Sequence, residues 1–190
     1  NIKGAIFNQG YNNAGGNARP RLYASVIRAM IENWRKAFRD AEMPFGIIGL
    51  TPGGQPQTRD NYEIRMVDAA PFIREGQLKA AQTLNHVCFM PAYDQQVPFY
   101  HPHKKVLHGE RVARWALATQ HGQTQLKWKP TTLERSEINA DHIILSFSNM
   151  VRVHDGRPFE GFAVAGKDRH FVPARAEFVI KGKDDRGREQ

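Results

Sequence analysis

The sequence contains little that would cross-link the chain or anchor it in a membrane. Cys88 is the single cysteine among 190 residues, so no disulfide can form within the chain. Its neighbours, in the order His-Val-Cys-Phe-Met, are mostly apolar, which is typical of a buried strand and not of a reactive thiol. No stretch approaches the roughly 18 consecutive apolar residues that a membrane-spanning helix requires. We therefore expect a soluble chain without a membrane span.

The composition supplies enough apolar residues for a core and a charge that could suggest nucleic acid. Hydrophobic residues make up 41% of the chain, and 27 Lys and Arg against 19 Asp and Glu give a formal net charge of +8. The basic residues are spread along the chain among acidic ones, whereas nucleic-acid-binding proteins gather them in patches. The charge therefore indicates a solvated surface, and we expect no nucleic-acid partner.

The hydrophobic pattern of the first part of the chain predicts alternating strands and helices. Short apolar runs bounded by turn residues predict strands, and apolar residues three and four positions apart predict helices. The predicted strands are residues 2–8, 45–50 and 86–93, and the predicted helices are residues 21–39, 72–84 and 104–119. Three strand-then-helix units favour an α/β fold with a parallel sheet covered by helices.

After Gly122 the pattern changes to short β-like runs separated by turns. These runs are residues 126–129, 143–147, 159–164 and 171–180. Short strands at close spacing favour an antiparallel arrangement. We therefore predict two domains, an α/β part at 1–122 and a β-rich extension at 123–190.

The loops that follow the predicted parallel strands should meet at one edge of the sheet, where open α/β folds bind ligands. The loop after the first strand contains Gln9, Gly10 and Asn12. Glycine allows a tight turn, and an asparagine amide can donate to a developing negative charge. The alternative is an ordinary Asn-rich turn, since Asn tolerates left-handed backbone and caps helices.

A histidine-rich segment leads into the last predicted helix. His101 at its start could act as a general base, and it could equally cap the helix or lie on the surface. With His103, and with His108 and His86 nearby, it also permits a metal site. Two adjacent lysines and the absence of a neighbouring carboxylate disfavour metal binding, so we expect no metal.

Two sequence blocks resemble the sialate O-acetylesterase family, carbohydrate esterases with an SGNH-hydrolase catalytic domain. Residues 4–14 resemble that family's WYQGESNA segment, and residues 101–113 are similar to its HPxxKxxxGxRLA segment, which carries the catalytic histidine. Further similar blocks follow in the same order along the chain: residues 34–35, 43–45, 74–77, 161–168 and 171–174. The resemblance implies an incomplete three-layer α/β/α SGNH-type sheet that lacks its N-terminal strands, followed by the antiparallel extension.

The resemblance also implies a reaction and roles for particular residues. It implies hydrolysis of acetyl esters on sugars by a serine nucleophile, with His101 as base and no metal or organic cofactor. Residues 10–13, Gly-Tyr-Asn-Asn, correspond to the block that has the form Gly-x-Asn-Asp in the wider superfamily, so the resemblance gives Asn12 the oxyanion role by its position. Gln9 and Gly10 belong to the same family-like segment. Asp94 is the nearest carboxylate that could orient His101, or it is a simple turn aspartate.

The sequence departs from the family in ways that shape the hypothesis. No segment resembles the family's GQSNM nucleophile block, and the four serines are predicted in a helix (Ser25), at a turn (Ser136) and in a β-run (Ser146 and Ser148). Tyr11 stands where the family has Glu. We therefore expect the serine to come from an upstream part of the same parent protein, so that this chain alone is inactive.

Two further expectations rest on the family or on its absent elements. Family members are often exported, so the resemblance implies a secreted or periplasmic location. The absent nucleophile motivates an alternative function, a non-catalytic relative of the same fold that binds a glycan or acts as a scaffold.

Overall fold

The computed structural model describes residues 2–14, 19–51, 70–94, 105–151, 159, 162–168 and 171–179. The chain divides into two compact units, the first containing Asn1–Pro56 and Asp68–Pro130 and the second containing Gln57–Val67 and Thr131–Gln190. Among the described residues, none of the helices has the length and apolar character needed to traverse a bilayer.

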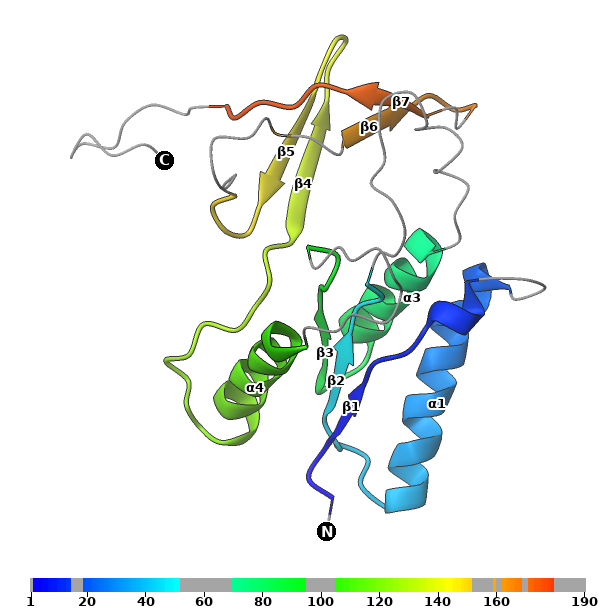
Figure 1. Cartoon of the computed structure of the whole chain (residues 1–190), viewed down its shortest axis with the longest axis vertical. Helices are drawn as coiled ribbons and strands as arrows, with labels where there is room; N and C mark the ends of the chain where they lie inside the picture. The colour runs from blue at the N-terminus through cyan, green and yellow to red at the C-terminus, as the bar shows by residue number, and fades with distance from the viewer. Residues whose placement is uncertain are drawn as a thin grey trace. The chain divides into compact units, whose positions relative to one another are not determined.

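The first unit contains a three-stranded parallel sheet in the order β1-β2-β3 (Figure 1). The strands are β1 (Ala5–Phe7), β2 (Phe45–Ile48) and β3 (Val87–Met90). Each is shorter than the apolar run that predicted it, because the ends of the runs leave the sheet as loops. The predicted parallel sheet is confirmed.

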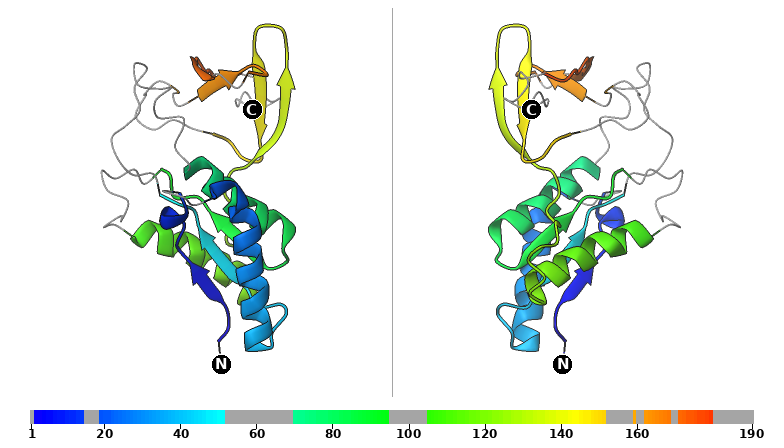
Figure 2. Two further views of the ribbon diagram at one scale, coloured as in Figure 1. Left: turned by 90° about the vertical axis from the view of Figure 1, so that its right-hand side faces the viewer. Right: turned by 90° about the vertical axis from the view of Figure 1, so that its left-hand side faces the viewer.

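Helices join the strands and pack on both faces of the sheet (Figure 2). They are α1 (Tyr23–Phe38), α3 (Ala70–Thr83) and α4 (Val106–Gln120), with single turns of 3-10 helix at η1 (Tyr11–Asn13) and η2 (Pro20–Leu22). The α1 and α3 helices pack against each other on one face, while α4 packs on the other. The predicted mixed α/β class is confirmed.

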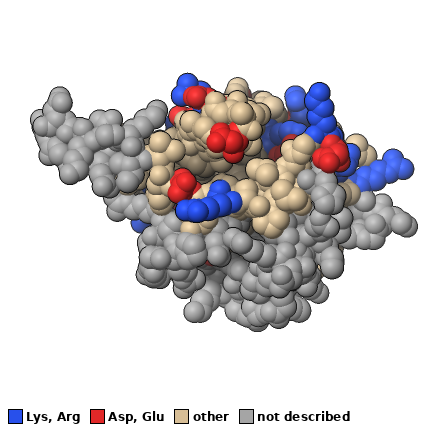
Figure 3. Space-filling model, turned by 90° about the horizontal axis from the view of Figure 1, so that it is seen from above, with Lys and Arg blue, Asp and Glu red and all other residues tan. Residues whose placement is uncertain are grey.

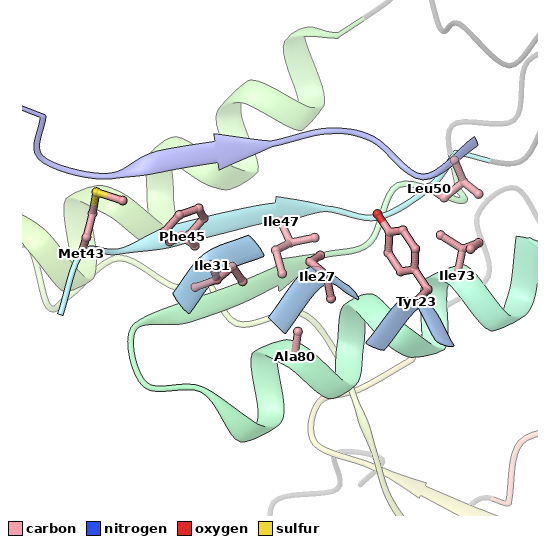
Figure 4. Close-up of a cluster of buried hydrophobic side chains, with 9 residues drawn as sticks. All are labelled: Tyr23, Ile27, Ile31, Met43, Phe45, Ile47, Leu50, Ile73 and Ala80. Atoms are coloured by element: carbon pink, nitrogen blue, oxygen red, sulfur yellow. The ribbon is translucent and has the colours of Figure 1, made fainter. Parts of the chain in front are cut away.

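The strand pleat divides the buried side chains between two clusters. On β2, Phe45 and Ile47 point toward α1 and α3, whereas Ile48 points toward α4, because successive strand residues face opposite sides. Figure 4 shows the first cluster, which contains Tyr23, Ile27, Ile31, Met43, Phe45, Ile47, Leu50, Ile73 and Ala80. The second cluster contains Ile48, Cys88, Met90, Ala92, Val112 and Trp115. Cys88 is thus buried as predicted, and its burial raises the pKa of the thiol to about 12.

A buried arginine fastens the end of α1 to the sheet. The Arg35 guanidinium donates to the carbonyl of Met43 from Nε at 3.1 Å and from Nη2 at 3.0 Å. The same Nη2 donates to the carbonyl of Asn85 at 2.6 Å. Because these carbonyls precede β2 and β3, one side chain sets the amino ends of both strands.

The second unit contains two antiparallel strand pairs. One pairs β4 (Leu133–Ile138) with β5 (Ile143–Phe147), and the other pairs β6 (Phe162–Ala165) with β7 (Phe171–Ala174). The predicted antiparallel strands are confirmed in kind, and β5 has its predicted limits.

Three details of the β prediction are wrong. The run predicted at 171–180 is a strand only as far as Ala174. Residues 126–129 form no strand, because Trp128 instead packs against the cluster beneath α4. The β4 strand was not predicted, because its Leu-Glu-Arg-Ser-Glu-Ile sequence is largely polar and every one of its side chains is exposed. Backbone pairing with β5 holds β4 in place, and a hydrophobicity pattern carries no information about that pairing.

Both signs of charge are present on the face of the molecule that Figure 3 presents. Figure 3 shows Lys and Arg side chains among Asp and Glu side chains on the face that it presents. Several opposite charges form exposed ion pairs, such as Arg28 with Glu32 and Lys79 with Glu75, each at 2.8 Å. These pairs place basic and acidic side chains next to each other on the surfaces of α1 and α3.

Candidate functional site

The backbone segments that follow β1 and β2 lie together at the carboxyl edge of the sheet, as expected. Gln77 on α3 connects them, because its Nε2 donates to the carbonyl of Gln9 at 3.0 Å and its Oε1 accepts from the backbone N–H of Leu50 at 2.9 Å. The end of β3 joins them through the N–H of Gly49, which donates to the carbonyl of Met90 at 2.8 Å. This edge is where parallel α/β sheets place their ligands.

Gly10 allows the first of these segments to turn inward against α3. Its φ of 149° lies in the region that residues with a side chain rarely adopt. A Cβ at this position would lie 2.7 Å from Cγ2 of Ile73. The predicted tight turn at Gly10 is therefore present, and the backbone conformation and the close approach both require glycine.

Tyr23, at the start of α1, also holds this turn. Its hydroxyl donates to the carbonyl of Gln9 at 3.1 Å and to Oε1 of the same residue at 3.3 Å. Burial raises the pKa of Tyr23 to about 12, so the hydroxyl keeps its proton at neutral pH and remains a donor. Figure 4 shows the ring among the core side chains with its hydroxyl directed at the sheet.

The two asparagines of η1 have different environments. Asn13 is tied into the turn, since its Oδ1 accepts from Nε2 of Gln9 at 2.9 Å and its N–H donates to the carbonyl of Gly10 at 3.0 Å. The Asn12 side chain is exposed and has no hydrogen-bond partner among the described residues. Asn12 is therefore the one whose amide is available to an incoming ligand.

Asp94, in the turn four residues after the end of β3, pairs with Arg111 of α4. Its carboxylate accepts from both terminal nitrogens of Arg111, with Nη1 at 2.9 Å from Oδ1, and Nη1 also donates to the carbonyl of Pro91 at 2.6 Å. The hydrogen bonds from Arg111 hold the pKa of Asp94 below its usual value. His101 and His103 lie outside the described residues, so the role of Asp94 toward His101 stays a prediction.

The histidines within the described ranges do not come together. His86, just before β3, pairs with Glu42 at 2.8 Å, whereas His108 is buried on α4. In the part of the chain that the structure describes, no three His, Cys, Asp or Glu side chains are grouped to hold a metal ion. The metal alternative for His101 and His103 concerns residues outside those ranges.

The serines lie on α1 and in the β-rich part. Ser25 is on α1, Ser146 is on β5, and Ser136 is on β4 and not at the predicted turn. The Ser148 hydroxyl accepts from the backbone N–H of Thr132 at 2.9 Å. None of the four directly follows a strand of the parallel sheet.

His108 is a buried histidine whose environment the sequence did not reveal. Its side chain is 2% exposed, and neither ring nitrogen has a hydrogen-bond partner in the described structure. Burial, and then the positive charge of Arg111, lowers its pKa, with Lys105 acting in the same direction and Asp94 opposing. His108 is therefore neutral in the folded chain, and it weakens the fold because a buried polar atom without a partner loses its hydrogen bonds to water.

Replacing His108 by leucine should stabilise the chain. We expect His108→Leu to raise the free energy of unfolding by about 1 to 3 kcal/mol, the cost of an unsatisfied buried polar group. Urea denaturation at neutral pH measures this, with exposed His121→Leu as the control that should change little. The folded-state pKa of His108 lies below its ordinary 6.5, so the unfolded chain binds the extra proton and stability falls as the pH drops below about 6.5. The advantage of the variant should therefore widen in acid, and an equal or lower stability would contradict this account.

Two residues that matter at this edge, Gln77 and Tyr23, were not predicted as site residues. Gln77 belongs to the family-like block at residues 74–77, for which the resemblance implied no role. Tyr23 is not among the apolar residues whose spacing predicts the helix at residues 21–39. The available signal was a glutamine at a position that continues the buried stripe of α3, between Ile73 and Ala80. A polar residue on such a stripe has to find partners in the interior.

Comparison with known proteins gives a structural relative. No protein-family model matches the sequence, and no curated protein matches it. The structure is similar to the crystal structure of XAC1771, a novel carbohydrate acetylesterase from Xanthomonas citri, with a TM-score of 0.79 and 26% sequence identity. The match covers 94% of this chain and 40% of XAC1771, so the chain spans less than half of that protein's length. The mixed α/β fold is thus shared with a carbohydrate acetylesterase.

Proposed function

We propose that this chain is the distal part of an SGNH-type carbohydrate O-acetylesterase, which removes acetyl groups from sugars and resembles the sialate O-acetylesterases. The nucleophilic serine comes from upstream polypeptide of the same protein, and the complete catalytic domain is a three-layer α/β/α sheet. The substrate is an acetylated sugar or glycan, no metal or organic cofactor takes part, and the protein acts in a secreted or periplasmic location.

The observation that carries this proposal is the presentation of Asn12. Its amide is exposed and without a partner among the described residues, at the carboxyl edge of a fold shared with a carbohydrate acetylesterase. Asn13, Gln9 and Tyr23 hold the turn beneath it. The turn that carries Asn12 is thus held in place while the Asn12 amide stays open to a ligand, and stabilisation of an oxyanion requires such a donor, already positioned where negative charge develops.

The mechanism follows from these roles. The upstream serine attacks the acetyl carbonyl while His101 removes the hydroxyl proton, and the carbonyl oxygen becomes negative in the tetrahedral intermediate. Asn12 and backbone amides donate to that oxygen. His101 then returns the proton to the sugar oxygen as the acyl bond breaks, and water releases acetate by the same steps.

Loss of the Asn12 amide tests the proposal. In the full-length protein, we expect Asn12→Ala to lower kcat for acetate release by about a hundredfold or more, the typical effect of one oxyanion donor. The thermal midpoint should change little, because the side chain is exposed and makes no internal hydrogen bond with the described residues. Acetate released from acetylated mono- and oligosaccharides is the measurement.

Two comparisons make the result specific. Asn33→Ala, on the exposed face of α1, is the matched control and should retain wild-type kcat. An Asn12→Ala protein with unchanged kcat would remove Asn12 from the mechanism. A folded wild-type protein that binds an acetylated glycan and releases no acetate would favour the non-catalytic alternative.

A further inference from the structure

Gln77 is a fully buried polar side chain in an otherwise apolar part of the core. Its exposed fraction is 0%, and it lies on the face of α3 that also buries Ile73 and Ala80. Burying a primary amide is costly unless its polar atoms find partners. A leucine or methionine would fill the same space without that cost, so the hydrogen bonds of Gln77 account for an amide at this position.

Both ends of the Gln77 amide contact the backbone of other segments. Nε2 donates to the carbonyl of Gln9, and Oε1 accepts from the N–H of Leu50. These two backbone groups follow β1 and β2, so one rigid group fixes the distance between two segments at the carboxyl edge. The carbonyl of Gln9 directly precedes Gly10. Gly10 lies so near Ile73 of the same helix that an added Cβ would be 2.7 Å from Cγ2 of Ile73.

We infer that Gln77 is a positioning residue of the active site: through the carbonyl of Gln9 it fixes the turn that presents Asn12, and through Leu50 it fixes the segment after β2 relative to that turn. This inference rests on the proposed esterase function. Gln77 contacts neither substrate nor reacting atoms. Its effect is on where the Asn12 amide stands when negative charge develops.

The expected kinetic result is a loss of kcat with little change in KM. Gln77→Leu keeps the volume of the side chain and removes both hydrogen bonds, and we expect kcat for acetate release by the full-length protein to fall about ten- to a hundredfold, as displacement of a catalytic group does. KM should stay within about threefold, because a displaced oxyanion donor affects the transition state more than the bound substrate. Gln82→Leu, the same substitution at an exposed position of α3, is the control and should match the wild type.

A second variant gives a readout that a merely structural role would not produce. Gln77→Glu keeps an acceptor for the N–H of Leu50, but its ionised carboxylate has no proton to donate to the carbonyl of Gln9. Burial favours the protonated carboxyl group, which can donate. The ratio of variant to wild-type kcat should therefore rise as the pH is lowered, whereas the ratio for Gln77→Leu should stay constant.

Hydrogen exchange tests the same inference without any enzymatic activity. In Gln77→Leu, the amide of Leu50 loses its acceptor, and we expect faster exchange at Leu50 and in residues 10–14, with α4 unchanged. A folded Gln77→Leu protein with wild-type exchange or wild-type kcat would overturn the inference. If Gln77→Leu does not fold, a Gln77→Glu to wild-type kcat ratio that is independent of pH overturns it. A wild-type full-length protein without esterase activity defeats the proposed function instead, and the exchange pattern still decides whether Gln77 fixes the turn.

Discussion

His101→Ala should lower kcat for acetate release by the full-length protein by about three to four orders of magnitude. The upper range of general-base effects applies, because in the proposed mechanism the same imidazole removes the proton from the serine and returns it to the leaving sugar oxygen. KM should change far less than kcat, since the histidine acts on the reacting proton and not on the bound sugar. Steady-state assays of acetate release on a sugar acetate measure both constants.

The control for this variant is His121→Ala. His121 is exposed at the end of α4, and its loss should leave both constants unchanged. A folded His101→Ala protein with near-wild-type kcat would exclude His101 as the base. The search for the base would then turn to other histidines, and neutral His108, in the first turn of α4, is the first described one to test.

Gly10→Ala should destabilise the first unit and disable the site together. The alanine would be forced to a φ of 149°, and its Cβ would lie 2.7 Å from Cγ2 of Ile73. A strained backbone costs about 1 to 3 kcal/mol and an overpacked core a similar amount. We expect the free energy of unfolding to fall by about 3 kcal/mol or more, measured by urea denaturation. In the full-length protein, kcat should fall at least as far as in Asn12→Ala, because the turn that presents Asn12 has to move.

Gly109→Ala is the matched control for this substitution. Gly109 lies within α4 with a negative φ, and a Cβ added there would meet no neighbour within 4 Å among the residues that the structure describes. Alanine there should stabilise the chain by about 0.5 to 1 kcal/mol, because glycine loses more backbone entropy in a helix. If Gly10→Ala were as stable as the wild type, the turn would have to accept a side chain, and the requirement for glycine in the site would be disproved.

The helices were predictable because their burial follows a period of 3.6 residues. Even so, the apolar face predicted for residues 21–39 is wider than the surface that α1 buries. The residues at this spacing are Leu22, Val26, Ile27, Met30, Ile31, Trp34 and Phe38. Ile27 and Ile31 are buried as expected, whereas Val26, Trp34 and Phe38 are each about half exposed. The sheet and α3 cover only part of the apolar face of α1. The periodicity of the sequence predicts which side of a helix is apolar, but it does not predict how much of that side the neighbouring elements cover.

The part of the candidate site that could be predicted is the turn at Gly10, because its backbone conformation depends on the residue type at that position. Glycine at position 10 predicts a turn, and the order of strands and helices predicts that this turn lies at the carboxyl edge of the sheet. Gln77 and Tyr23 support the turn through contacts that span 68 and 14 positions of the sequence. Such pairings depend on how the helices dock, and a single sequence records the residues without recording which of them meet. The different environments of the Asn12 and Asn13 side chains were unpredictable for the same reason. The hydrogen bond from Gln9 to Asn13 distinguishes the two, and it depends on the folded conformation of the turn.

The burial of Cys88 has a consequence for where this chain can work. A thiol with a pKa of about 12 is almost never ionised at physiological pH, and its place in β3 shields it from dissolved oxidants. Sulfenic acid formation and mixed disulfides both begin from an accessible thiolate. Cys88 is therefore expected to remain a free thiol in the folded first unit under both reducing and oxidising conditions.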